Sequence, residues 1–171
     1  MPSWRWEQVA EMLDNPKMGA ELGVKEGRFT SHMLRTFPQL RMIAVDLWEP
    51  RAPIDREGFE TYDGWDFDDI IAKFGHAIAG YEQRCDIMRM STLDAAANVA
   101  EASLDFVFID AEHTYEAVRA DILTWRWKLK PGGLLAGHDY NDKSFPGVCR
   151  AVDELCPKRI LGSDTVWMIR V

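Results

Sequence analysis

Short apolar runs alternate with amphipathic segments along most of the chain. Runs of strand length lie at residues 20–22, 41–46, 85–90, 104–110 and 134–139, and another closes the sequence at 165–171. Between them, apolar residues recur every three or four positions, which is the period of a helix. Runs such as 41–46 are apolar at successive positions, as in parallel strands that are buried on both faces. This alternation predicts an α/β fold with a doubly wound, mostly parallel sheet and helices on both faces.

One stretch breaks this alternation. Residues 47–65 are polar, aromatic and rich in proline and glycine, so we interpret them as a long loop and a candidate lid over a ligand. The first sixteen residues, 1–16, predict an N-terminal helix that Pro16 ends. Residues 1–171 contain no repeat or linker, so we expect a single domain. The tryptophans at 4, 6, 125 and 127 are expected to pack in the core and against helices rather than to form a substrate box.

Composition and charge narrow the class of protein. The 171 residues are 47% hydrophobic, which suffices for one core, and the net charge is −8. Scattered positive residues disfavour a nucleic-acid partner, which would require a basic face. We find no apolar run near the length of a membrane helix and no apolar signal core, so no membrane partner is expected. Three widely spaced cysteines disfavour a disulfide framework and favour a reducing cytoplasmic location.

Acids at strand ends give the main functional signal. Asp46, Asp110 and Asp139 each end an apolar run, and doubly wound sheets bind ligands at the carboxyl ends of their strands. The turn after the first strand carries Gly23 and Gly27 but has Lys25 where a dinucleotide site has its middle glycine. Asp46 follows about 20 positions later, where an acid binds ribose hydroxyls. A ribose-bearing ligand without a pyrophosphate is therefore expected, and S-adenosylmethionine fits that description.

Four segments in order extend this interpretation to a family. They are AELGVKEGRFT, AVDLWEP, DFVFIDAEHTYE and KPGGLLAGHDY, and with them the chain resembles the class I S-adenosylmethionine-dependent methyltransferases. The resemblance covers roughly the whole chain and is closest to small single-domain members. It implies a Rossmann-like sheet of seven strands, the last of which runs antiparallel.

The resemblance also implies roles for individual residues. Glu21 and Gly23 would lie beside the methionine moiety, with Gly27 closing the glycine turn. Asp46 would bind the ribose hydroxyls. The residues implied near the adenosine or its adenine ring are Leu47, Trp48, Met90 and Ser91. Asp110 would lie near the sulfonium and the incoming substrate.

Transfer to a hydroxyl requires removal of a proton, and two routes remain open. His113, His138 and Asp139 are candidates for that step, and His138 is the favoured base if its ring faces the pocket. Alternatively, Asp110 and Asp139 match two metal-ligating acids of catechol-type and caffeoyl-type O-methyltransferases, which implies Mg²⁺. Those relatives carry asparagine directly after the second acid, whereas this chain has Tyr140.

We therefore expect a methyltransferase that modifies the hydroxyl of a small molecule or a sugar. A nicotinamide-dependent Rossmann oxidoreductase and a non-catalytic S-adenosylmethionine-binding module are the alternatives. A homo-oligomer, in which a partner subunit completes the pocket, is compatible with a chain of this length.

Overall fold

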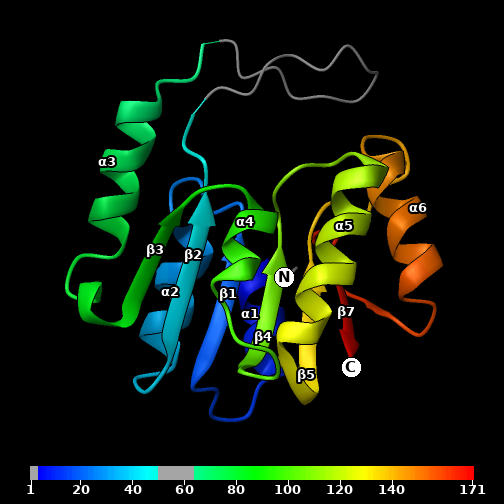
Figure 1. Cartoon of the computed structure of the whole chain (residues 1–171). Coiled ribbons are helices and arrows are strands. Elements are labelled where there is room, and N and C mark those ends of the chain that lie inside the picture. The colour runs from blue at the N-terminus through cyan, green and yellow to red at the C-terminus, as the bar shows by residue number, and fades with distance from the viewer. Residues whose placement is uncertain (1–3, 50–63) are drawn as a thin grey trace.

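One seven-stranded sheet forms the centre of the molecule (Figure 1). The computed structural model describes residues 4–49 and 64–171. The strands follow the order β3-β2-β1-β4-β5-β7-β6 across the sheet. Their bounds are β1 Met18–Leu22, β2 Arg41–Asp46, β3 Cys85–Arg89, β4 Leu104–Ile109, β5 Leu129–Gly137, β6 Ile160–Leu161 and β7 Trp167–Arg170. The first five strands are parallel, and β7 runs antiparallel to β5 and to β6. The predicted fold class is confirmed.

Helices cover both faces of this sheet (Figure 1). The α-helices are α1 Arg5–Glu11, α2 Arg28–Thr36, α3 Phe67–Ala77, α4 Thr92–Ala97, α5 Tyr115–Trp125 and α6 Pro146–Leu155. Two short 3₁₀ helices, η1 Glu82–Arg84 and η2 Arg126–Lys128, lead into β3 and β5. Side-chain oxygens of Asp66, Ser91 and Thr114 each accept a hydrogen bond from a backbone amide at the start of α3, α4 and α5. These caps fix where three of the helices begin.

Two cores form because side chains alternate between the two faces of each strand. On β4, Phe106 and Phe108 pack with α1, α2 and α3, while Val107 and Ile109 pack with α4, α5 and α6. The same alternation occurs along β2. Burial on both faces accounts for the unbroken apolar runs in the sequence.

The structure corrects two expectations about local features. The Pro131-Gly132-Gly133 segment, whose composition is typical of a turn, lies inside β5, where it produces a shift in the pairing register with β4. Trp125 is fully buried as expected, but Trp4 and Trp127 are 58% and 68% exposed.

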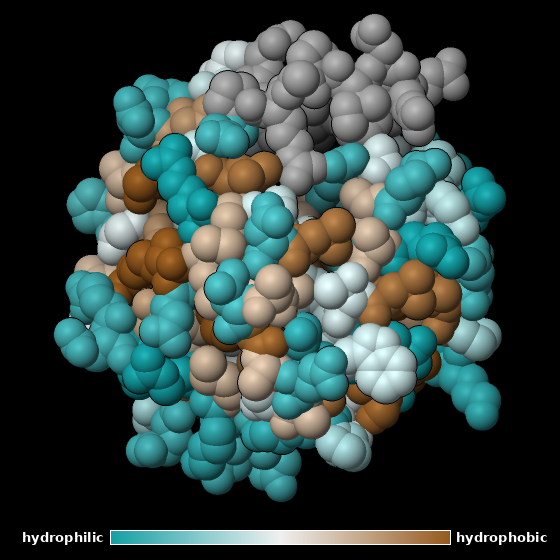
Figure 2. Space-filling model, in the orientation of Figure 1, coloured by the Kyte–Doolittle hydropathy of each residue, from teal (hydrophilic) through white to brown (hydrophobic). Residues whose placement is uncertain are grey.

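The surface of the described residues carries both hydrophobic and hydrophilic side chains. On the face in view, hydrophobic residues form separate patches between hydrophilic ones (Figure 2), which is ordinary for a protein surface in water. Among the described residues, no helix has the length and apolar character that crossing a membrane requires.

Candidate active site

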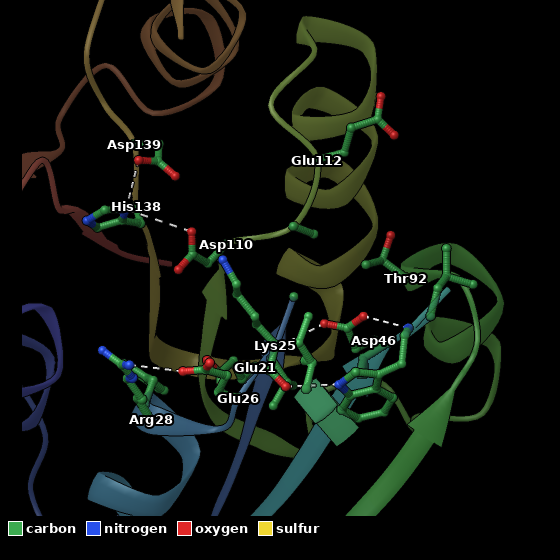
Figure 3. Close-up of a pocket in the computed structure, with 18 of the residues that line it drawn as sticks. Glu21, Lys25, Glu26, Arg28, Asp46, Thr92, Asp110, Glu112, His138 and Asp139 are labelled. Atoms are coloured by element: carbon green, nitrogen blue, oxygen red, sulfur yellow. Dashed lines mark hydrogen bonds and ion pairs between the residues drawn. The ribbon is translucent and has the colours of Figure 1, made fainter. Parts of the chain in front are cut away.

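A cavity of about 570 Å³ opens at the carboxyl ends of β1, β2, β4 and β5. The volume is in the range of small-molecule and cofactor sites. Titratable side chains line opposite sides of it: Asp110, His138 and Asp139 gather on one side, and Asp46 lies on the other (Figure 3). The strand ends therefore bring together the acids that the sequence predicted to meet.

The turn after β1 needs glycine for a reason internal to the protein. Gly23 has φ +85°, and a Cβ there would lie 2.1 Å from the backbone oxygen of Asp110. The ends of β1 and β4 are thus packed too closely for any side chain at this position. Gly27, also with positive φ, does not line the cavity; a Cβ there would lie 2.6 Å from the Phe74 ring. Its place in the structure is the start of α2.

Two backbone amides, one in the turn after β1 and one just after β2, hold the Asp46 carboxylate. Its Oδ2 accepts a hydrogen bond from the amide of Lys25 at 2.8 Å, and its Oδ1 accepts one from the amide of Trp48 at 2.8 Å. Both donors have left-handed backbones, with φ of 51° and 46°, a conformation that bulky residues adopt at a cost. The Trp48 indole also donates to the Lys25 carbonyl. The carboxylate therefore stabilises two strained residues and still has lone pairs for a ligand.

Glu21 is the most deeply buried acid of the cavity wall. Its Oε2 accepts hydrogen bonds from the backbone amide of Thr30 at 3.0 Å and from the Thr30 hydroxyl at 2.5 Å. Burial raises the pKa of Glu21 well above its usual value, the Thr30 bonds oppose the rise, and the charge of Asp110 adds to it. This pairing links the end of β1 to α2.

Asp110 lies at the centre of a charged cluster. Arg5 Nη1 in α1 is 2.6 Å from its Oδ2, and His138 Nδ1 is 3.7 Å from its Oδ1. Burial raises the pKa of Asp110 to about 7, while the neighbouring His138 and Arg5 limit the rise. Arg5 also approaches Asp164, with 3.5 Å between Nε and Oδ2.

Asp139 bridges two histidines. His113 Nε2 lies 2.8 Å from its Oδ2, and His138 Nδ1 lies 2.9 Å from its Oδ1. Burial opposes ionisation of Asp139, but hydrogen bonds with both histidines hold its pKa below its usual range. Burial would lower the pKa of His138, yet the bond with Asp139 and the charge of Asp110 raise it. Asp139 thus remains an anion that orients both rings.

The two rings differ in their access to the cavity. The His138 side chain is only 7% exposed, and its Nε2 lies 3.2 Å from the Thr165 hydroxyl. The His113 side chain is 22% exposed and packs on the Phe145 ring at a centroid distance of 4.3 Å. His113 is therefore the more accessible of the two imidazoles.

Three of these residues could offer ligand atoms to one ion. Atoms of Asp110, His113 and Asp139 lie within 4.8 Å of one another. The residues after Asp139 point elsewhere, since the Tyr140 hydroxyl donates to Asp153 at 2.8 Å. The Asn141 side chain accepts from the Lys143 amide at 3.1 Å.

Most of the predicted site residues line the cavity. These are Glu21, Gly23, Asp46, Leu47, Trp48, Met90, Ser91, Asp110, His113, His138 and Asp139. The Ser91 hydroxyl is also the cap of α4. Of the candidate lid at 47–65, residues 47–49 and Trp65 line the cavity, whereas residues 50–63 lie outside the described part.

The sequence pattern did not indicate three residues that contact Asp110 or His138, namely Arg5, Asp164 and Thr165. Arg5 is separated from Asp110 by 105 positions, and Asp164 and Thr165 belong to the connection between β6 and β7. No local pattern marks such residues, because only the folded topology brings them to the carboxyl ends of β4 and β5.

The strand order, the antiparallel seventh strand and the acids at the strand ends define the class I S-adenosylmethionine-dependent methyltransferase fold. The chain belongs to the family described as "Methyltransferase domain", whose sequence model matches residues 20–140. This membership sets aside the nicotinamide-dependent oxidoreductase. No curated protein matches the sequence.

Solved structures share the fold at low sequence identity. A candidate caffeoyl-CoA O-methyltransferase from Staphylococcus aureus aligns over 99% of this chain and 83% of its own, with a TM-score of 0.71 and 15% identity. An O-methyltransferase from Bacillus cereus, in complex with S-adenosylhomocysteine, aligns over 97% and 78%, with a TM-score of 0.65 and 15% identity. TomG from Streptomyces achromogenes, an O-methyltransferase of tomaymycin synthesis in complex with S-adenosylmethionine, aligns over 97% and 78%, with a TM-score of 0.63 and 13% identity.

Proposed function

We propose that this protein transfers a methyl group from S-adenosylmethionine to a hydroxyl of a small molecule or sugar. The observation that carries the proposal is one cavity with Asp46 on one side and the Asp110, His113 and Asp139 cluster on the other. The first side suits a ribose, and the second suits removal of a proton. Similarity to O-methyltransferases supports the reaction type, and a cytoplasmic location is part of the same proposal.

The residues present fit the methyl donor. Asp46 would accept the ribose hydroxyls with the lone pairs that its two backbone donors leave open. Met90 and Ser91 would contact the adenine, and Leu47 and Trp48 the adenosine. Glu21 and Asp110 would face the positive methionine end, and Gly27 would act by shaping the turn. When bound, the donor supplies a methyl group already activated by its sulfonium.

His113 is our candidate for the proton acceptor. Its ring is the more exposed of the two imidazoles, and Asp139, 2.8 Å from its Nε2, orients it. His138 is also held by Asp139, but its Nε2 faces the Thr165 hydroxyl. We therefore assign His138 and Asp139 to the orientation of the base and of Asp110, and the transfer itself depends on positioning the acceptor.

The contacts around the two acids fit Mg²⁺ poorly. Mg²⁺ demands near-octahedral oxygen coordination, whereas the third atom beside Asp110 and Asp139 is a nitrogen of His113. In addition, the Arg5 guanidinium is paired with Asp110. We therefore derive no step through a metal ion.

Calorimetry and a transfer assay test the proposal. S-adenosylhomocysteine is expected to bind the purified protein with one site, whereas NAD is expected to give no heat. Formation of S-adenosylhomocysteine from S-adenosylmethionine is then measured with matched hydroxyl and amine acceptors. Absence of S-adenosylhomocysteine binding would contradict the proposed cofactor. Turnover confined to amine acceptors would contradict methyl transfer to a hydroxyl. Binding without turnover of any acceptor would favour the non-catalytic module.

A further inference from the structure

Helix α1 places an arginine inside the cavity. Arg5 Nη1 lies 2.6 Å from Asp110 Oδ2, and the two side chains are 27% and 18% exposed. On its other side, Arg5 approaches Asp164, between β6 and β7. Both segments lie outside the matched residues 20–140. Arg5 and Asp164 therefore lie outside the region that the family model matches, whereas Asp110 lies inside it.

We propose that Arg5 is the resident cation of this site, and that its guanidinium excludes a divalent metal ion from the Asp110 and Asp139 pair. The inference goes beyond the proposed function, because it concerns which cation the two acids accept and does not require methyl transfer. It makes Arg5 a positioning residue that acts through Asp110.

The carboxylate oxygens are already engaged. Arg5 holds Asp110 Oδ2, while His113 and His138 lie at 2.8 and 2.9 Å from the two oxygens of Asp139. Three nitrogen groups therefore lie against three of the four carboxylate oxygens on which a metal ion would depend. An incoming ion would have to displace them, and among the described residues the partly buried guanidinium would then keep Asp164 as its acidic neighbour.

Charge leads to the same conclusion. The guanidinium is always protonated, and a divalent ion on Asp110 would lie beside it in a site that water screens only partly. The third oxygen ligand is also missing from its expected place. Tyr140 donates to Asp153, and Asn141 accepts from the Lys143 amide. The acids match a metal pair by position in the sequence, but their surroundings favour a fixed organic cation.

Manganese binding tests the inference without any methyl acceptor. Electron paramagnetic resonance of free Mn²⁺ is recorded while the wild type, Arg5→Gln and Arg5→Lys are titrated. The wild type and Arg5→Lys are expected to leave Mn²⁺ free. Arg5→Gln, which frees Asp110, is expected to bind one Mn²⁺ at least roughly tenfold more tightly than the wild type. Adding Asp139→Asn to Arg5→Gln should abolish the gain, and Arg35→Gln on the exposed side of α2 should behave as the wild type.

Two results would overturn the inference. One is stoichiometric Mn²⁺ binding by the wild type that Asp139→Asn removes, a result that stands even if Arg5→Gln fails to fold. The other is a folded Arg5→Gln variant that binds no more Mn²⁺ than the wild type. Calorimetry with S-adenosylhomocysteine on the same samples keeps this failure distinct from failure of the proposed function.

Discussion

The carboxylate of Asp46 accepts a hydrogen bond from the backbone amide of Lys25 at 2.8 Å, and this contact joins the end of β2 to the turn after β1. The same carboxylate accepts a hydrogen bond from the backbone amide of Trp48. Since both donors have left-handed backbones, the acid shapes the wall of the cavity besides contacting a ligand. Its replacement should therefore affect binding and local stability together.

We expect Asp46→Ala to weaken binding of S-adenosylhomocysteine. Loss of hydrogen bonds to a charged group costs about 1.5–3 kcal/mol, or roughly 10- to 100-fold in the dissociation constant. Isothermal titration calorimetry measures the change. Asp86→Ala is the matched control, because Asp86 belongs to β3 and pairs with Arg41 at the surface. Equal affinities of Asp46→Ala and the wild type would contradict the ribose assignment.

His113→Ala should slow methyl transfer and leave cofactor affinity unchanged. Loss of a positioned base costs on the order of 100-fold or more in kcat, whereas the cofactor contacts proposed here do not include His113. A transfer assay and calorimetry on the same sample separate the two effects. His76→Ala, an exposed histidine on α3 bonded to the Ala72 carbonyl, should keep full activity. A larger loss in His138→Ala than in His113→Ala would transfer the role of base to His138.

Gly23→Ala should destabilise the fold far more than Gly80→Ala. Both glycines have positive φ, +85° and +84°, but a Cβ at Gly23 would lie 2.1 Å from the Asp110 oxygen while one at Gly80 meets nothing within 4 Å. Backbone strain alone costs about 1–2 kcal/mol, and the clash adds about 1–3 kcal/mol. Urea unfolding of both variants measures the difference. Equal losses would show that β1 and β4 can separate at little cost.

The buried Asp110 should make stability depend on pH. Because burial raises its pKa to about 7, the folded state resists ionisation that the unfolded chain undergoes near pH 4. The stability that this group contributes is therefore complete below about pH 4 and is lost as pH rises to about 7, by up to about 4 kcal/mol. Asp110→Asn removes the titration, so its stability relative to the wild type should rise over this range. Urea unfolding at several pH values measures it, and a constant difference would contradict the raised pKa.

The sheet could be predicted from the sequence because buried strands require apolar residues at successive positions. Strands covered on both faces carry unbroken apolar runs such as 104–109, and the acids at their ends must meet at one edge. The Pro131-Gly132-Gly133 segment was misinterpreted because the residues that favour a turn also allow an irregularity within a strand. Roles for Asp46 and Asp110 followed from these strand ends and the family resemblance. The contact of Arg5 with Asp110 could not be predicted, because it depends on how α1 packs near the carboxyl end of β4.

The antiparallel end of the sheet bears on how the protein is made. Strand β7 is the last in sequence, yet it lies between β5 and β6, and the segment just before it carries Asp164 and Thr165. While the chain emerges from the ribosome, the earlier strands can assemble first, but β5 lacks its second neighbour until β7 is released. The Thr165 contact of His138 therefore forms only after the segment between β6 and β7 has been synthesised, later than the strands whose ends carry Asp46 and Asp110.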